Sequence, residues 1–333
     1  MHKPIDFVVT WVDDSDPKWQ EEKRRYRGDE GNSQDNVGVT RYRNWGLMPY
    51  WFRGVEKFAP WVNKVYFVTC GQRPAWLNVN HPKLVCVDHR DYMPAEALPV
   101  FNSNAIELNM HQIPGLSDDF VYFNDDFFII GPLREADFFR DGVPCDFAAL
   151  DILTPTDDFG YIWLNMMLVI NRHFDKRRVL KEHFGKWYNL GDPKSLMRTL
   201  ALSYPWDRFS AIRDYHIPTA YTKADFERVW AAIPEELRAT QRHRFRSKED
   251  LGPQLMRFWR LAEGRFCPSS RRAFGFMPLM NDNCGQICDI VENQKKRILC
   301  INDEYAGTDF EGTKARLLAA FDRILPEKSA FER

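Results

Sequence analysis

The stretch "FVYFNDDFFIIG", residues Phe120 to Gly131, sets three polar side chains between two strongly apolar runs. The polar residues are Asn124, Asp125 and Asp126, and an ionised carboxylate is costly to bury unless it is paired, hydrogen-bonded or bound to a metal. The apolar flanks are typical of a strand buried on both faces of a parallel sheet, where sites gather at the carboxyl ends of strands. This placement favours a functional site. The alternative is an exposed turn between two apolar segments.

Two other apolar runs also end in acidic residues. The run "IDFVVTWV" (Ile5 to Val12) precedes Asp13, and "KRILCIND" (Lys296 to Asp303) precedes Glu304. If these strands and the one at Phe120 are neighbours in one sheet, their carboxyl ends converge. Clustered acids are the usual ligands of a hard divalent cation such as Mg²⁺ or Mn²⁺. Chance proximity of unrelated loop acids remains the alternative explanation.

The remaining pattern predicts a mostly parallel α/β sheet of the nucleotide-binding kind, with helices on its faces. Strands are expected at Lys64 to Cys70 and Lys83 to His89, and apolar residues at helical spacing precede the first of them. After about residue 150 the pattern becomes largely helical, before the strand at Lys296 and a closing helix. We therefore expect an α/β region that contains the Asp cluster at 1–150, a mainly helical region at 151–295 and a returning strand and helix at 296–333.

Composition excludes several classes of protein. The 333 residues carry 46 Lys or Arg against 47 Asp or Glu, so no net field draws the protein to nucleic acid or to an anionic membrane. The seven cysteines lie mostly in apolar stretches, which fits reduced thiols in the cytoplasm better than a disulfide framework. We expect no signal peptide and no transmembrane segment, so that any membrane association at the inner face is peripheral.

Several segments resemble, in order, the four conserved blocks of the Stealth family. These segments are "IDFVVTWVDDSDPKW", "RYRNWGLMPYWFRGVEKFAPWVNKVYFVTCGQRPAWLN", "LPVFNSNAIELNMHQIPGLSDDFVYFNDDFFI", "HIPTAYTK" and "CINDEY". The family contains bacterial capsule-polymer sugar-phosphate transferases and the animal N-acetylglucosamine-1-phosphotransferase. The resemblance implies transfer of hexose-1-phosphate from a nucleotide-sugar, usually a UDP-sugar, to a hydroxyl of a glycan acceptor in capsule or surface polysaccharide synthesis. The product would be a phosphodiester, and UMP would be released. Residues 1–150 would then form the nucleotide-sugar-binding region, and residues 151–295 the acceptor and specificity region.

The resemblance also implies roles for individual residues. Asp125 and Asp126 are the expected Mg²⁺ ligands, with Asp303 as a partner, because phosphoryl transfer needs cations at the phosphate oxygens. His216 is the expected general base, since imidazole titrates near neutral pH, although Asp125 or Asp126 could instead take the proton. Glu107 is expected to hold a donor sugar hydroxyl or to orient a neighbour.

A further set of residues is expected to bind substrate. Trp11 and Asp13, at the end of the first strand, suit the uridine or ribose of the donor. Arg41, Arg271 and Arg272 could neutralise phosphate oxygens through bidentate contacts. Asn104 and Asn124 complete the expected substrate contacts. Where relatives commonly carry an acid, this chain has Asn44, to which we assign no catalytic role.

Two other functions use the same residues differently. A metal-dependent glycosyltransferase would hold Mg²⁺ at the Asp pair, but attack would fall on the anomeric carbon and UDP would be released. A non-catalytic carbohydrate-binding protein would account for the aromatic content of 14%. It gives no reason for three acidic strand ends, so it ranks below both enzymes.

Overall fold

The computed structural model describes residues 3–27, 43–204 and 206–333. Its central sheet has five strands in the order β10-β4-β1-β2-β3, of which β1 to β4 are parallel and β10 is antiparallel to β4. The strands span β1 Ile5–Thr10, β2 Val65–Thr69, β3 Leu84–Asp88, β4 Asp119–Phe123 and β10 Thr219–Thr222. The predicted mostly parallel α/β sheet is therefore confirmed, with an antiparallel edge strand that the helical half of the chain contributes.

A second, three-stranded sheet divides the "FVYFNDDFFIIG" segment in two. This sheet has the order β12-β13-β5, with β12 parallel to β13 and β5 antiparallel to it. Its strands are β5 Phe127–Ile129, β12 Phe274–Leu279 and β13 Ile298–Asp303. The strand that ends at Asp303 is therefore not a neighbour of β1 and β4 in one sheet, so the condition considered for convergence of the three strand ends is not met. The chain leaves the central sheet at Phe123, turns through the three polar residues and enters the second sheet at Phe127.

Short strands and helices complete the described chain. The short strands are β6 Phe139–Arg140, β7 Val143–Asp146, β8 Leu150–Asp151, β9 Ala211–Ile212 and β11 Cys267–Pro268. The helices are α1 Pro17–Arg27, α2 Met48–Phe58, α3 Ser103–Glu107, α4 Phe159–His173, α5 Lys176–Glu182, α6 Phe184–Trp187, α7 Pro193–Ser203, α8 Lys223–Ala232, α9 Pro234–Arg242, α10 Gln254–Ala262, α11 Cys284–Glu292 and α12 Phe310–Ile324. Single 3₁₀ turns lie at η1 His89–Asp91, η2 Ala95–Ala97, η3 Met110–Gln112, η4 Glu135–Asp137 and η5 Arg271–Ala273.

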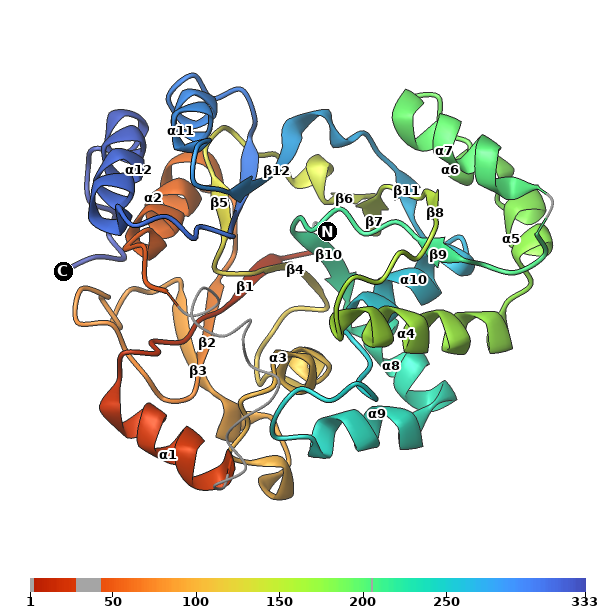
Figure 1. The fold of residues 1–333 in the computed structure, drawn as a ribbon, viewed down its shortest axis with the longest axis horizontal. Coiled ribbons are helices and arrows are strands. Elements are labelled where there is room, and N and C mark those ends of the chain that lie inside the picture. The colour runs from red at the N-terminus through yellow and green to blue at the C-terminus, as the bar shows by residue number, and fades with distance from the viewer. Residues whose placement is uncertain (1–2, 28–42, 205) are drawn as a thin grey trace.

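Two groups of helices lie on opposite sides of the molecule, and α1, α3, α8 and α9 lie in the lower part of the view (Figure 1). Helices α2, α11 and α12 lie beside β5 and the second sheet, whereas α4 to α7 form a lobe at the opposite side of the molecule. Helix α2 approaches β5 very closely, because a Cβ atom at Gly54 would lie 2.4 Å from the carbonyl oxygen of Ile129. In the described ranges, no helix combines the length and apolar character needed to cross a membrane.

A buried carboxylate fixes the amino-terminal ends of the central strands. Asp6 on β1 is fully buried, and its Oδ1 accepts hydrogen bonds from Asn63 Nδ2 at 2.8 Å and from the Lys64 amide at 3.1 Å. Its Oδ2 accepts from the Ser117 amide at 2.7 Å. Asp6 therefore ties the segments that lead into β2 and β4 to β1, and the opposite, carboxyl ends of these strands face the functional cavity.

Candidate active site

A cavity of about 910 Å³ lies at the carboxyl ends of the central strands. It sits where the strand order reverses, because β2 and β3 extend to one side of β1 and β4 extends to the other. Such a switch point is the usual ligand position in open α/β sheets. Residues that follow β1, β4 and β13 line it together with the loop before β10. Asp125 and Asp126 after β4 and Asp303 at the end of β13 therefore share one cavity, although they come from two sheets.

Asp125 and Asp126 form the turn between β4 and β5. The Asp125 side chain is exposed toward the cavity, yet surrounding protein and the neighbouring charge of Asp126 raise the pKa of its carboxyl group. Asp126 is held more tightly, because its backbone carbonyl accepts from the Ile301 amide of β13 at 2.9 Å. Two carboxylates of like charge side by side are stabilised by a cation.

His216 lies in the loop between β9 and β10 and faces Asp126. Its Nε2 is 3.4 Å from Asp126 Oδ2, and its backbone amide donates to Asp214 Oδ2 at 3.3 Å. Its backbone has a φ of 47°, a left-handed conformation that is uncommon for residues other than glycine. Burial lowers the pKa of the imidazole, but the hydrogen bond and charge of Asp126, with the charge of Asp214, outweigh it and leave the pKa raised.

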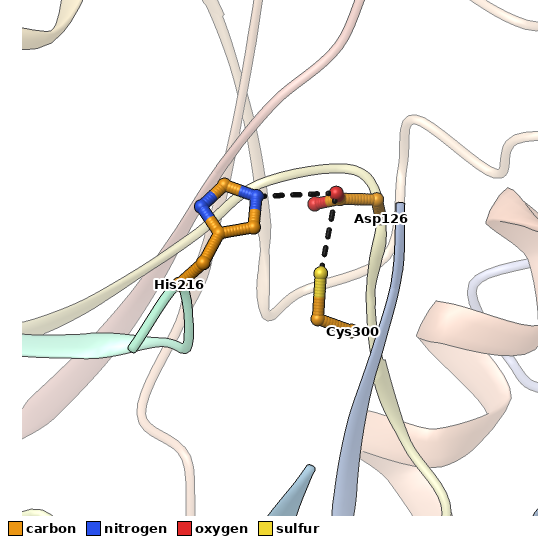
Figure 2. A group of neighbouring side chains, drawn as sticks. All are labelled: Asp126, His216 and Cys300. Atoms are coloured by element: carbon orange, nitrogen blue, oxygen red, sulfur yellow. Dashed lines mark hydrogen bonds and ion pairs between the residues drawn. The ribbon is translucent and has the colours of Figure 1, made fainter. Parts of the chain in front are cut away.

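Cys300 on β13 contacts the same carboxylate from another side (Figure 2). Its Sγ lies 3.3 Å from Asp126 Oδ2, and burial together with the charge of Asp126 raises the pKa of the thiol well above its usual value. The thiol therefore stays protonated and donates to Asp126. One ligand atom from each of Asp126, His216 and Cys300 lies within 4.8 Å of the others. Figure 2 shows the imidazole and the thiol on different sides of the carboxylate.

These residues fit a divalent cation. Asp126 Oδ1 is buried and finds no hydrogen-bond partner within the described parts of the chain, although an unsatisfied buried carboxylate oxygen is costly. Asp125 adds a second carboxylate beside it. Oxygen ligands of this kind suit Mg²⁺ or Mn²⁺, whereas the imidazole and the thiol suit softer ions.

Asp303 reaches the cavity in a different setting from the one predicted. Its Oδ2 accepts from Trp45 Nε1 at 2.8 Å and lies 3.6 Å from Arg43 Nε, while its Oδ1 accepts from the Tyr305 amide at 3.0 Å. Asp303 lies outside the cluster formed by Asp126, His216 and Cys300. We therefore do not carry it forward as a metal ligand, because its carboxylate oxygens are already held by neighbouring donors.

Glu107, at the end of α3, is buried beside the cavity wall. Burial raises the pKa of its carboxyl group to about 7, although a hydrogen bond from Tyr122 and the charge of Arg246 act in the opposite direction. The Tyr122 hydroxyl also lies 3.0 Å from Thr10 Oγ1 at the end of β1. This arrangement connects Glu107 to two of the strands that form the site.

The structure separates the two residues predicted at the end of β1. Trp11 lines the cavity and stacks on Phe67 of β2, with ring centroids 5.6 Å apart. Asp13 is not a lining residue, because its Oδ1 accepts from the Ser15 amide at 3.0 Å and from the Ser15 hydroxyl at 2.6 Å. Trp11 is therefore placed to contact a ligand, and Asp13 stabilises the turn after β1.

The other predicted substrate contacts also divide into two groups. Asn124 and Arg271 line the cavity, and Arg271 Nε donates to Asp192 Oδ2 at 2.9 Å. Asn104 is buried, and its amide donates to Asp250 Oδ2 at 3.2 Å, so it serves the internal packing of α3. Arg272 is exposed and outside the lining. Arg41 lies outside the described residues.

Several lining residues were not predicted from the sequence. Arg43 follows the first arginine of the "RYRNWG" motif, which could have drawn attention to it. The segment Arg213–Tyr215 lies just before His216 and lines the cavity with it. The Tyr215 ring lies near two cations: the guanidinium carbon of Arg271 is 4.2 Å from its centroid and that of Arg213 is 5.7 Å away. Their position directly before the "HIPTAY" motif could have indicated in the sequence that Arg213–Tyr215 belong to the site.

The chain was compared with protein-family models and with solved structures. The chain matches Stealth protein conserved region 1 over residues 3–31 and conserved region 2 over residues 41–145. A crystal structure of galactosyltransferase LgtC with donor and acceptor sugar analogs covers 94% of this chain and 95% of LgtC. Its sequence identity is 10% and its TM-score is 0.36, so we draw no conclusion from it.

Named relatives match along nearly the whole chain. Capsular polysaccharide phosphotransferase WcwK of Streptococcus pneumoniae is 39% identical over 330 residues, which cover 99% of this chain and 98% of the relative. Receptor polysaccharide phosphotransferase WefC of Streptococcus gordonii is 39% identical and covers 100% of both chains. Exopolysaccharide phosphotransferase cps2G of Lactiplantibacillus plantarum is 38% identical over 99% of this chain and 96% of the relative. The resemblance seen in the sequence motifs is thereby confirmed, and the chain belongs to the Stealth family.

Proposed function

We propose that the protein transfers hexose-1-phosphate from a UDP-sugar to a hydroxyl of an oligosaccharide or polysaccharide in capsule or surface polysaccharide synthesis. The observation that carries the proposal is the meeting of Asp125, Asp126 and His216 in one large cavity at the switch point of the sheet. The relatives named as polysaccharide phosphotransferases support the same reaction class.

The transfer joins two substrates without an external oxidant or reductant. The oxygen of the acceptor hydroxyl attacks the β-phosphorus of the donor and forms a new O–P bond. The bond from the β-phosphorus to the oxygen that bridges the two phosphates breaks, and its electron pair leaves with UMP. The proton of the hydroxyl passes to a base on the enzyme.

His216 is our candidate for this base. In the neutral ring, Nε2–H donates to Asp126 and leaves the lone pair of Nδ1 to accept the proton. Asp126 then holds the ring in place and stabilises the imidazolium that forms. Charge on the phosphoryl oxygens would be neutralised by Mg²⁺ or Mn²⁺ bound at Asp125 and Asp126.

The surrounding residues suit the two substrates. We assign the uracil ring to Trp11, which lies at the end of β1 with one face supported by Phe67. Arg271 suits phosphate oxygens, and the aromatic face of Tyr215 suits a sugar ring of the acceptor. All seven cysteines are unpaired, which fits our proposal that the enzyme works in the cytoplasm.

Identification of the released nucleotide tests the proposal. The purified protein is supplied with Mg²⁺, a UDP-hexose and a capsule-type oligosaccharide, and the products are separated by chromatography. Release of UMP that depends on the acceptor and stops in EDTA is the expected result. Release of UDP would instead identify a glycosyltransferase, and no nucleotide release with any donor would leave only a binding function.

A further inference from the structure

Large apolar side chains are exposed in one part of the molecule. Among the described residues, thirteen large apolar side chains are exposed, and ten of them lie between residues 152 and 206. Exposed apolar side chains scattered singly are normal, but a concentrated set indicates an interaction surface. These residues lie on or beside helices α4 to α7, which are at the right of Figure 1.

Helix α7 has its apolar residues on the outside. Its inward face carries the buried polar residues Ser195 and Thr199, and the Thr199 hydroxyl accepts from the Leu150 amide at 3.2 Å. Its outward face carries Met197 and Leu200 at a spacing of three residues, and Tyr204 follows four residues later. A surface helix normally shows the opposite arrangement. The outward face of α7 is therefore suited to an apolar environment.

The apolar face continues at both ends of the helix. We define the α7 surface by its exposed side chains. They are Leu190 at 83%, Met197 at 66%, Leu200 at 51%, Tyr204 at 79% and Trp206 at 57% exposure. Tyrosine and tryptophan are enriched at membrane–water interfaces, where the ring is apolar and its polar atom remains hydrated.

The segment that carries the α7 surface has a net positive charge. Residues 171–210 contain nine Lys or Arg and four Asp or Glu, a net charge of +5 in a chain whose total is −1. Lys194 and Arg198 lie on α7 and Arg208 follows shortly after it; all three are exposed, and Arg198 pairs with Asp151. Apolar residues combined with a basic surround are the features of a helix that lies in the interface of an anionic bilayer.

We propose that the α7 surface docks on an anionic phospholipid bilayer. This inference is drawn from the exposed apolar and basic residues of the helical lobe, and it does not depend on the chemistry assigned to the cavity. Charge complementarity favours an anionic bilayer, because the segment has a net positive charge and the exposed Lys194 and Arg208 lie before and after the apolar residues of α7 in the sequence. The side chains of Leu190, Met197 and Leu200 would enter the interface. Tyr204 and Trp206 would lie at the level of the headgroups.

Docking would bring the cavity close to the membrane. The inward face of α7 contacts the cavity wall, because Ser195 Oγ lies 2.7 Å from the hydroxyl of Tyr215 and Asp192 pairs with Arg271. A helix is roughly 10 Å across, so the wall would lie about that far from the bilayer surface. An acceptor glycan held at the membrane could then enter the cavity while the enzyme stays docked.

Vesicle flotation of the full chain tests docking. The probes are vesicles of phosphatidylcholine alone and vesicles of phosphatidylcholine mixed equally with phosphatidylglycerol. Wild-type protein should float with the mixed vesicles, and added salt should weaken the binding. The double variant Leu200→Ser/Tyr204→Ser should bind the mixed vesicles at least about tenfold more weakly, because it lacks two apolar side chains that docking would bury in the bilayer.

A matched control and three contrary outcomes complete the test. Met280→Ser removes another exposed apolar side chain, 48% exposed and distant in sequence, and should leave flotation unchanged. Failure to bind either vesicle, or equal binding to both without salt dependence, would overturn the proposal. So would a stable dimer in sedimentation that the double variant abolishes, since it would assign the surface to a second copy. Nucleotide release with a soluble acceptor should remain at the wild-type level in the double variant.

Discussion

The Oδ2 atom of Asp126 accepts hydrogen bonds from the imidazole of His216 and the thiol of Cys300. Its Oδ1 atom is buried without a partner among the described residues. An amide at this position has nearly the same shape, but it lacks the charge that would bind a cation. Asp126→Asn should therefore lower turnover by roughly a hundredfold or more while the melting temperature changes little. Acceptor-dependent nucleotide release and a thermal melt measure the two quantities.

An acidic residue on the surface supplies the control for Asp126. Asp289 on α11 pairs with Lys295, and both side chains are about half exposed, so Asp289→Asn should leave turnover and stability near wild type. Turnover of Asp126→Asn within a factor of a few of Asp289→Asn would contradict a role for Asp126 in cation binding.

His216 combines a left-handed backbone with a side chain that faces the carboxylate cluster. Asparagine tolerates this backbone better than alanine, so His216→Asn removes the imidazole with little added strain. A general base should lose about 10²-fold to 10⁴-fold in kcat with little change in KM for the donor. Steady-state kinetics decide the matter. A structural histidine would instead lower the melting temperature and leave the kcat of the folded enzyme intact.

The contribution of Glu107 to the free energy of unfolding should change with pH in the opposite direction from that of a salt-bridged acid, whose pKa is lowered. Its folded-state pKa of about 7 lies above the ordinary value of 4.5, so ionisation opposes folding. The stability associated with this group is full below about pH 4.5 and falls as pH rises through 7. Glu107→Gln should therefore raise the free energy of unfolding by about 2 kcal/mol at pH 8 and change it little at pH 4.5.

Denaturant unfolding in EDTA at both values measures the Glu107 effect, because the chelator removes any cation bound nearby. A variant that is equally destabilised at pH 8 and at pH 4.5 would show that the carboxylate is needed for its hydrogen bonds and is not strained by burial.

At the residue scale, the sequence identified acids and a histidine but not their contacts. Asp125, Asp126, His216 and Glu107 could be predicted because strand ends and motif resemblance marked them. The Cys300 contact could not, because it joins residues 174 positions apart across two sheets. Asn104 was expected at the substrate, yet a buried partner 146 positions away uses its amide.

At the scale of elements, a buried arginine anchors the loop that carries His216. Arg257 on α10 donates to the carbonyls of Arg213 at 2.9 Å and Phe147 at 3.0 Å, and it pairs with Asp146 at 2.8 Å. Asp146 also pairs with Arg260 at 2.6 Å. This network explains how a loop without regular structure keeps His216 in a strained conformation.

Removal of Arg257 should therefore be costly. Arg257→Met leaves Asp146 with one cation fewer and the loop carbonyls without their donor, so the free energy of unfolding should fall by about 3–5 kcal/mol. Denaturant titration measures the change. The exposed pair of Arg238 with Glu235 gives the control, and Arg238→Met should cost below about 1 kcal/mol. Equal effects of the two substitutions would contradict the anchoring role.

The elements themselves were largely predictable, whereas their pairing was not. Apolar runs closed by polar turns marked β1 to β4 and β13, and helical spacing marked α2. The largely helical pattern after residue 150 and the closing helix correspond to α4 to α10 and to α12. Periodicity does not tell which sheet a strand joins, so the separation of β13 from the central sheet was missed. Strand β5 was hidden inside one continuous apolar pattern that in fact serves two sheets.

At the scale of the whole molecule, two sheets and a helical lobe enclose one cavity. The central sheet provides Trp11 and the Asp pair, the loop before β10 provides His216, and the helical half provides Arg271. The predicted boundaries at residues 150 and 295 stay a prediction. The arrangement gives the helical half a direct part in the site, through Tyr215 and Arg271, and a separate outward face on α7.

The central claim is that the β-phosphorus of the donor moves to the glycan. A UDP-hexose that carries radioactive phosphorus only at the β-position follows this atom directly. After incubation with Mg²⁺ and the oligosaccharide acceptor, the label should migrate with the glycan, and the released UMP should be unlabelled. If all of the label remained in released UDP and the glycan carried none, phosphotransfer would be contradicted. That result would show that the anomeric carbon is attacked.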